Sequence, residues 1–116
     1  MKIKPLIWTA SALDDLRAFP DDARRQSGYQ LRRVQMGLTP DDWKAMASVG
    51  QGVFEVRVHT ALEHRVLYIS KFDEAVYVLH AFEKRTMKTQ QADIELAKDR
   101  LAAVQRSRSA RKKDKP

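Results

Sequence analysis

The chain contains no cysteine, which excludes disulfide bonds and metal sites held by thiolates. It has no apolar run near the roughly 20 residues that a membrane-spanning helix requires, and its first residues lack the long apolar centre of a secretory signal. We therefore expect a soluble, cytoplasmic protein that makes no membrane contact. With 116 residues, no internal repeat and no sign of a second core, the chain is predicted to form one domain.

The positive charge of the chain is concentrated at its C-terminal end. The formal net charge is +7, and residues 106–116 carry six basic side chains and one acidic side chain, which leaves +2 for the rest. A segment this polar and this like-charged is not expected to fold alone. We predict a domain over residues 1–105 and a basic, disordered tail over residues 106–116, which is either a solvated end or an arm that binds phosphate.

Three strand-like runs within residues 53–89 organise the predicted fold. Residues 53–59 alternate apolar and polar side chains, the period of two that is expected when one sheet face is buried. Residues 64–72 and 75–82 are apolar at both parities, as strands in the middle of a sheet tend to be. Short polar connections join the runs, so we predict a three-stranded antiparallel meander.

The segment before the meander is predicted to supply an edge strand and two helices. Residues 2–8 are β-prone, and Pro5 favours an edge position because it removes a ladder donor. Pro20 separates a helix that begins near residue 9 or 11 from a second that begins near residue 21 or 22 and ends at Gly37. These helices form an αα-hairpin over one face of the sheet. The expected apolar face of the second helix contains Ala23, Tyr29, Leu31, Val34 and Leu38.

Two further segments complete the predicted architecture. Residues 39–52 read as a connector in which residues 41–43 can begin a single helical turn, with Trp43 or Met46 docked on the core. A last helix begins near Thr89 or Asp93 and carries an apolar stripe of Ile94, Ala97, Leu101 and Val104. The fold class is therefore α+β, with a small antiparallel sheet built from an edge strand, an αα-hairpin, the meander and a C-terminal helix.

In this order and spacing, the strand motifs resemble those of the RelE/ParE/HigB superfamily of bacterial toxins, and in particular its phage-derived HigB-like branch. The resemblance covers about two-thirds of the chain. It is carried by Phe54-Glu55-Val56-Arg57, Arg65-Val66-Leu67-Tyr68, Leu79-His80-Ala81-Phe82-Glu83-Lys84-Arg85-Thr86, and Met87-Lys88-Thr89 leading into Asp93-Ile94-Glu95 and Ala97.

The resemblance implies a RelE-like fold and the toxin of a type II toxin–antitoxin system, neutralised by an antitoxin that is often a helix-turn-helix protein. It implies a ribosome-dependent endonuclease that cuts mRNA by attack of a ribose 2′-hydroxyl, without a metal or other cofactor. The toxin would bind operator DNA only as part of its complex with the antitoxin. Two alternatives stay open: a ParE-like gyrase inhibitor that acts by binding, and a degenerate module whose only activity is to bind its antitoxin and operator DNA.

The reaction implied by the resemblance builds negative charge on phosphate oxygens, which fixed cations stabilise. The matching positions are Arg57, Arg65, Lys84 and Arg85, with Lys88 as a further contact to substrate. Strand directions in a meander bring the first two near residues 59–64 and the end of the third strand toward the same region. The alternative is that the two strand arginines pair with Glu55, Glu63 or Glu83 as ordinary surface residues.

Histidines and one tyrosine are the remaining candidates. His80 lies in an apolar strand at the parity of Val76 and Val78, where it is either a catalytic group or a core histidine. His59 and His64 flank the first hairpin and are expected to be exposed as acids or bases that contact substrate. Tyr68 can stack on a base if it is exposed. Some RelE-like enzymes have a tyrosine just after the matching Lys-Arg pair, whereas this chain has none after Lys84 and Arg85. The identity of the general acid and of the general base therefore stays open. The histidine spacing predicts no metal site.

Overall fold

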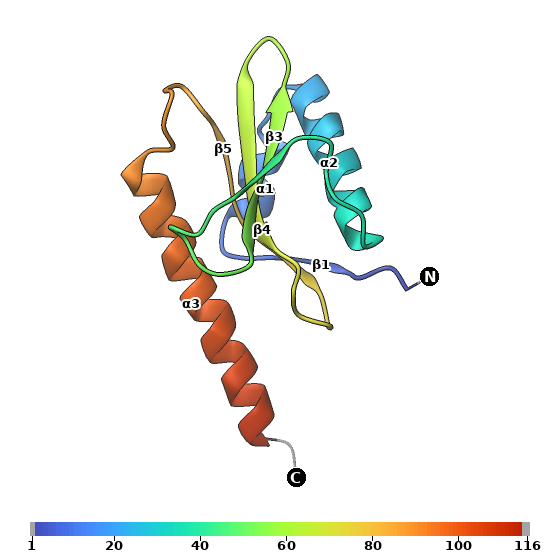
Figure 1. The fold of residues 1–116 in the computed structure, drawn as a ribbon, viewed down its shortest axis with the longest axis vertical. Helices are drawn as coiled ribbons and strands as arrows, with labels where there is room; N and C mark the ends of the chain where they lie inside the picture. The colour runs from blue at the N-terminus through green and yellow to red at the C-terminus, as the bar shows by residue number, and fades with distance from the viewer. Residues whose placement is uncertain (1, 115–116) are drawn as a thin grey trace.

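A computed structural model describes residues 2–114, which form one five-stranded sheet flanked by helices (Figure 1). The strand order is β1-β5-β4-β3-β2, so the meander occupies the centre as the sequence predicts. The elements in chain order are β1 (Leu6–Trp8), α1 (Ala12–Arg17), α2 (Asp21–Gln35), β2 (Trp43–Ala45), β3 (Val53–His59), β4 (Glu63–Ile69), β5 (Val76–Glu83) and α3 (Gln91–Asp114).

The sheet is mixed and not wholly antiparallel as expected. Strands β3, β4 and β5 pair antiparallel, which confirms the meander. Strand β1 runs parallel to β5, with Leu6 opposite Val76. No hairpin joins β1 to its neighbour, because β5 lies almost seventy residues further along the chain, so local turn chemistry does not fix its direction. Its edge position agrees with Pro5, which has no amide hydrogen to give to a neighbouring strand.

The connector before β3 holds a strand where we expected one turn of helix. Residues Trp43–Ala45 form β2 and pair antiparallel with β3, with Lys44 opposite Glu55. The turn between them includes Gly52 at φ +86°, a left-handed conformation that glycine adopts without steric cost. This turn folds the connector back along β3, and β2 becomes the second edge of the sheet.

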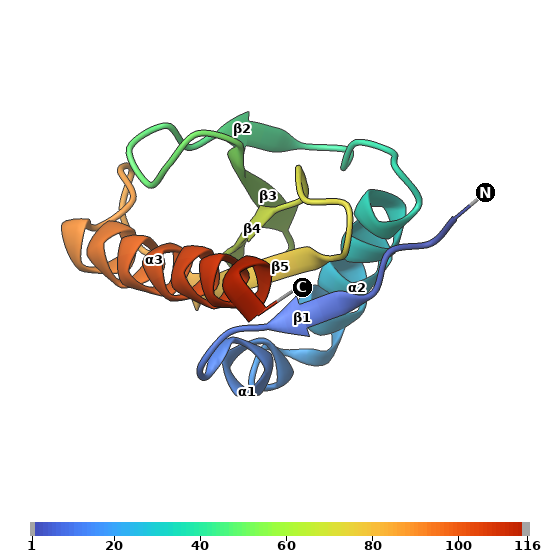
Figure 2. The ribbon, with the colours of Figure 1, turned by 90° about the horizontal axis from the view of Figure 1, so that it is seen from below.

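Helices cover both faces of the sheet (Figures 1 and 2). On one face, α1 and α2 bury Leu16, Leu31 and Val34 against Val56, Val66 and Val78. On the other, α3 packs its stripe of Ala97, Leu101 and Val104 on Val53, Leu67 and Leu79, and Ile94 is partly buried beside them. The predicted stripe of the last helix is thus confirmed. The side chains of β3 therefore point alternately to one helical layer and to the other. This alternation decides on which face each charged side chain of β3 lies.

The αα-hairpin is present, but its predicted buried face needs correction. Ala23, Leu31 and Val34 are buried, whereas Tyr29 is 59% exposed and Leu38 is 44% exposed. Ser27, which the predicted face did not include, is buried in the helix layer. It lies one turn from Ala23 and from Leu31, so a small polar side chain completes the 3.6-residue stripe.

Helix α3 continues through Asp114, into the segment for which we expected a disordered tail. Three contacts join its final turns to the body of the protein: Arg108 pairs with Glu74 at 2.6 Å, its guanidinium lies 3.8 Å from the centre of the Phe72 ring, and Arg111 donates to the Tyr77 hydroxyl at 3.5 Å. The end of the predicted tail, residues 115–116, lies outside the described residues. Among residues 2–114, no helix is long and apolar enough to cross a membrane.

Candidate functional site

Two arginines face each other across β3 and β4 on the sheet face that carries α3. Arg57 is paired in register with Arg65, and Glu55 is paired with Leu67, which packs under α3. Like charges directly opposite on a sheet repel each other. The carboxylate of Glu55 offsets this repulsion, because one of its oxygens lies 3.6 Å from the Nε atom of each arginine.

Glu55 is the centre of this arrangement. Its side chain is only 1% exposed, and a buried carboxylate needs paired charges or hydrogen-bond donors. Besides the two arginines, the Thr89 hydroxyl donates a hydrogen bond to Glu55 Oε2 at 3.2 Å, which joins the segment before α3 to β3. We call the three cations Arg57, Arg65 and Lys84, together with the carboxylate of Glu55, the cation cluster.

The two arginines differ in how accessible they are. Arg65 is 6% exposed, binds Glu63 at 3.0 Å and donates to the backbone oxygen of His64 at 2.9 Å. Arg57 is 33% exposed, and its Nη1 atom lies 3.9 Å from Asp42. Arg57 is therefore the arginine of the cluster that a bound phosphate can reach, whereas Arg65 is held inside the sheet by its partners.

Lys84 joins the cluster where β5 ends. Its backbone amide donates to the backbone carbonyl oxygen of Glu63 at 2.8 Å, which brings the end of β5 to the first hairpin. Partial burial lowers the pKa of the Lys84 ammonium, and the positive charges of Arg65, Arg57 and Lys44 lower it further, against the opposing effect of Glu55. Sequence analysis missed Lys44, because β2 was not predicted. Its cross-strand pairing with Glu55 adds a fourth cation to the region.

A small cleft of about 150 Å³ adjoins the cluster through Lys84. Arg85 and Lys88 also line it, so the predicted cations fall into two adjacent groups and not one. Arg85 is 83% exposed and forms an ion pair with Glu83. The full lining consists of Phe82, Glu83, Lys84, Arg85, Thr86, Lys88, Gln90 and Asp93.

His80 lies on the α3 side of β5 and not at the parity of Val76 and Val78. A β-bulge shifts the register, so that Leu67 pairs with His80 and Tyr68 pairs with Val78. His80 is 7% exposed, and its Nε2 atom is hydrogen-bonded to Asp93 at 2.7 Å. Because Asp93 also lines the small cleft, this pair joins β5 to the first turn of α3 beside Lys84.

His59 closes the hairpin end of the site. It is half exposed and lies between Asp42 and Glu63, with Nδ1 2.7 Å from a Glu63 oxygen. The hydrogen bond with Asp42 is the largest effect that raises the pKa of His59, and Glu63 raises it further, against a smaller effect of burial. The predicted exposure of His59 is confirmed, and its acidic neighbours favour the charged ring.

The structure does not bring His64 and Tyr68 to this face. His64 is 1% exposed, not exposed as predicted, and packs 4.3 Å from the Phe19 ring in the layer of α1 and α2. Burial lowers the pKa of His64. Tyr68 is 4% exposed on the same opposite face, and burial raises its pKa to about 12. Both belong to β4, where alternate residues point to opposite faces, so their neighbour in sequence, Arg65, lies on the other side.

As a whole, the site combines cations with carboxylates. Arg57, Arg65, Lys84 and Lys44 surround Glu55, while Glu63 and Asp42 pair with the arginines from the rim. Such an arrangement can orient a phosphate and stabilise charge that develops on it. Among residues 2–114, no three His, Asp or Glu side chains are grouped so that they could hold a metal ion.

Comparison with known families adds one finding. Residues 14–102 match the family model described as "Phage derived protein Gp49-like (DUF891)". This range includes α2, the whole meander and α3 as far as residue 102, with Ala97 and Leu101 of its buried stripe. No curated protein matches the chain.

Proposed function

We propose, from the premise that this chain belongs to the phage-derived Gp49-like family, that it is an mRNA endonuclease that acts on the ribosome. The Gp49-like family is a RelE/HigB-like toxin family, and a toxin of this kind implies a cognate antitoxin. The finer proposal is a type II toxin of the HigB-like branch. Its substrate is mRNA, the ribosome is a partner, and its antitoxin is a helix-turn-helix protein through which it reaches operator DNA.

The observation that carries this proposal is the meeting of Arg57, Arg65 and Lys84 at one end of the sheet. In cleavage by a ribose 2′-hydroxyl, the oxygen attacks the adjacent phosphorus and the bond to the 5′-oxygen breaks. Negative charge grows on the non-bridging oxygens and on the leaving oxygen. Fixed cations lower the energy of that state more than the energy of the bound substrate, which is the condition for catalysis.

The geometry suggests different roles for the three cations. Arg57 is a third exposed and can contact a non-bridging oxygen directly. Arg65 is nearly buried and acts as a positioning residue, because it shares Glu55 with Arg57. Lys84 has a lowered pKa, so its ammonium gives up a proton more easily than an exposed lysine and is suited to protonate the leaving oxygen.

The base that accepts the 2′-hydroxyl proton has two candidates. His80 is bonded to Asp93, an arrangement that fixes the orientation of an imidazole. His59 is more exposed but is bonded to two carboxylates, which raise its pKa, so less of it is present as the neutral ring that can accept a proton. Exchanging each for glutamine and measuring the pH dependence of cleavage distinguishes them. Arg85, Lys88 and the cleft that they line are proposed to hold the neighbouring phosphates of the RNA.

The proposal is tested by comparing Arg57→Ala with Arg24→Ala. Arg24 is also a partly exposed, ion-paired arginine, but it lies on α2 and binds Asp21 at 3.0 Å. We expect Arg57→Ala to reduce mRNA cleavage in a translating extract by about 100-fold or more, the effect of losing a donor to a developing oxyanion. Its stability should change by less than about 1 kcal/mol, because Arg65 still neutralises Glu55. The Arg24 variant should cleave like the wild type.

Cleavage must depend on ribosomes. Cuts at the A-site codon should appear with ribosomes and be absent with naked mRNA. If Arg57→Ala cleaves and arrests growth as the wild type does, the assigned site is wrong. If the wild type cuts no mRNA in either assay, the nuclease proposal itself fails.

The carboxylates of the site favour a second candidate function, that of a toxin that inhibits gyrase by binding. Arg65 is held by Glu63 and Glu55, and Arg57 approaches Asp42 and Glu55, so the arginines are partly neutralised before any substrate binds. A binding protein needs no free cations for chemistry. DNA breaks in expressing cells, without mRNA cuts, would support this function.

A further inference from the structure

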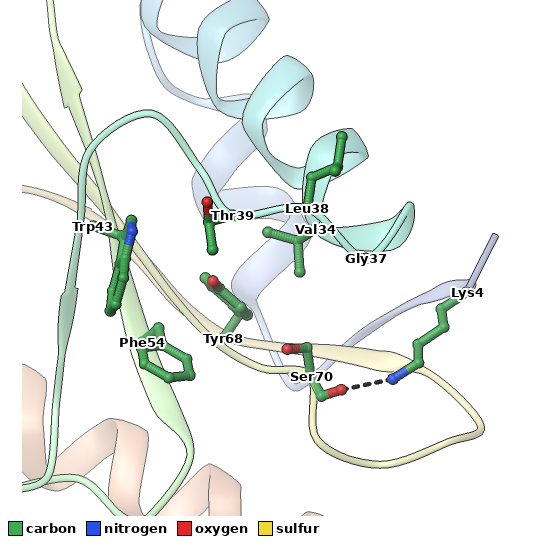
Figure 3. Close-up of a pocket in the computed structure, with 9 residues that line it drawn as sticks. All are labelled: Lys4, Val34, Gly37, Leu38, Thr39, Trp43, Phe54, Tyr68 and Ser70. Atoms are coloured by element: carbon green, nitrogen blue, oxygen red, sulfur yellow. Dashed lines mark hydrogen bonds between the residues drawn. The ribbon is translucent and has the colours of Figure 1, made fainter. Parts of the chain in front are cut away.

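An apolar pocket opens on the sheet face opposite the cation cluster, between α2 and the strands β2, β3 and β4 (Figure 3). Trp43, Phe54 and Tyr68 form one side of it, and Val34 and Leu38 face them from α2 and the turn that follows. The aromatic rings are in contact: Trp43 meets Phe54 edge to face at 5.2 Å, and Phe54 lies 6.0 Å from Tyr68. The pocket is therefore walled by large, fixed side chains.

The pocket has room for a side chain from another molecule. Its volume is about 200 Å³. An apolar cavity of roughly 150 Å³ is enough to hold a benzene ring. Two of its walls also remain exposed, since Trp43 and Leu38 are each 44% accessible. Large apolar side chains that stay exposed around a cavity are typical of binding sites.

Tyr68 brings a polar group to the pocket. The residue as a whole is 4% exposed, but its hydroxyl oxygen is not closed off inside the protein and opens on the pocket. The hydroxyl is therefore accessible to a ligand. Burial raises the pKa of Tyr68 to about 12, so the hydroxyl stays neutral and can donate a hydrogen bond near neutral pH. A ligand with an acceptor oxygen next to an apolar group would satisfy it.

The charges around the pocket favour an acidic ligand. Lys4 lines it and donates to the backbone oxygens of Ser70 and Phe72, at 2.6 Å and 2.9 Å, so its charge meets no carboxylate among the described residues. The acid at the rim, Asp41, already binds Gln30 and lies 3.8 Å from Arg33.

A free strand edge lies beside the pocket. Strand β2 ends the sheet, and all its residues, Trp43–Ala45, are exposed. Unpaired amide and carbonyl groups on an edge strand can bind the backbone of an extended peptide. A peptide backbone at this edge would lie next to Trp43, from which its side chains can reach the pocket.

We propose that this pocket anchors the antitoxin, by taking a large apolar side chain from an acidic segment of that protein. The inference rests on the proposed function, since it presumes that the chain is a toxin with a protein inhibitor. A nucleobase would also fit between aromatic walls. Lys4 is the one cation among the residues that line the pocket, which is fewer than an RNA backbone requires, and the cation cluster lies on the other sheet face, so a protein segment fits the pocket better.

The test measures binding of the purified product of the reading frame that adjoins this gene, using Leu38→Asp, Tyr68→Phe and a matched control. Leu62→Asp is the control, because Leu62 is 47% exposed against 44% for Leu38 and lies in the β3–β4 turn, away from the pocket. We expect Leu38→Asp to raise the Kd by about 30-fold or more, as for a central anchor contact. Tyr68→Phe should raise it by about three- to tenfold, as for one neutral hydrogen bond.

Growth assays keep this inference separate from the proposed function. If the inference is right, Leu38→Asp still arrests growth but is no longer rescued by co-expression of the partner, whereas Leu62→Asp is rescued. The inference is overturned if Leu38→Asp binds the partner with unchanged affinity, or if Leu62→Asp alone loses affinity for it. It is also overturned if Leu38→Asp loses RNA binding, or if the wild type does not bind the partner. Absence of growth arrest by the wild type counts against the proposed function alone, because the binding measurement still decides the pocket.

Discussion

At the scale of single residues, Glu55 determines how the site is organised. It would be an unfavourable residue on a buried sheet face if its neighbours were apolar. Here it lies 3.6 Å from the Nε atoms of two arginines that would otherwise repel each other. The carboxylate therefore allows Arg57 and Arg65 to occupy opposite positions on adjacent strands, and it also sets how much positive charge remains for a phosphate.

Exchange of Glu55 for glutamine tests this role. Glu55→Gln should lower the free energy of unfolding by about 1–3 kcal/mol, because two ion pairs are lost while the arginines stay opposite each other. Arg57 is a third exposed, which keeps the loss below that of a fully buried pair. Thermal or urea unfolding measures it. The control is Glu95→Gln on the exposed side of α3, where the ion pair to Lys98 is 3.9 Å long and little change is expected. Equal stability of the two variants would contradict the role given to Glu55.

At the scale of elements, α3 has two parts with different supports. Its first four turns pack an apolar stripe on the sheet, through Ala97, Leu101 and Val104. Its last turns extend beyond that core and are attached by Arg108, which binds Glu74 and covers the Phe72 ring. The pairing lowers the pKa of Glu74 to about 2, so the attachment persists through mildly acidic pH.

Removal of this attachment should loosen only the end of α3. In Arg108→Ala, we expect amide hydrogen exchange over residues 106–112 to become about two- to tenfold faster, as for the loss of one partly exposed ion pair and one cation–π contact. Exchange in the meander should be unchanged. Arg106→Ala is the control, because Arg106 is exposed and forms no ion pair with a described residue. Equal exchange in both variants would show that the last turns are stabilised by helix propensity alone.

At the scale of the whole molecule, the sheet separates two surfaces. The cation cluster and the small cleft lie on the α3 side, whereas the apolar pocket lies on the side of α1 and α2. Side chains of neighbouring residues in β3 and β4 therefore serve different surfaces. An antitoxin anchored in the pocket leaves the cation cluster uncovered unless it also wraps around the edge at β2.

Global stability should depend on pH in opposite directions through two histidines. The pKa of His59 is raised in the folded state, so its stabilising effect is complete below its ordinary pKa of 6.5 and is lost as pH rises through the folded-state value. The pKa of His64 is lowered, so folding favours its neutral ring and stability falls as pH drops below 6.5.

Replacing His59 should remove one of these two effects. In His59→Gln, the free energy of unfolding should no longer decrease as pH rises above 6.5, while the loss of stability on acidification persists. Urea unfolding at a series of pH values measures both arms, and proton NMR of the rings gives the order of the two pKa values directly. A His64 ring that titrates at higher pH than His59 would contradict the assignment.

The strand runs, the helix breaks and the α3 stripe were predictable from sequence, because they depend on local periodicity and on proline and glycine. Pro20 divides the two helices and Gly37 follows the second, as predicted. The convergence of Arg57 with Arg65 was also predictable, since a hairpin fixes the register of its own strands. The strand at Trp43–Ala45 was missed because three residues carry too little pattern, and Lys44 was missed with it.

By itself, the amino-acid sequence determined the order of the elements and the meander, since spacing along the chain encodes both. Tertiary structure alone decided which face each candidate residue occupies. The bulge beside Leu67 moved His80 to the α3 side, and strand alternation placed His64 and Tyr68 on the face of α1 and α2. The physical reason is that one inserted residue reverses the side on which every later side chain lies.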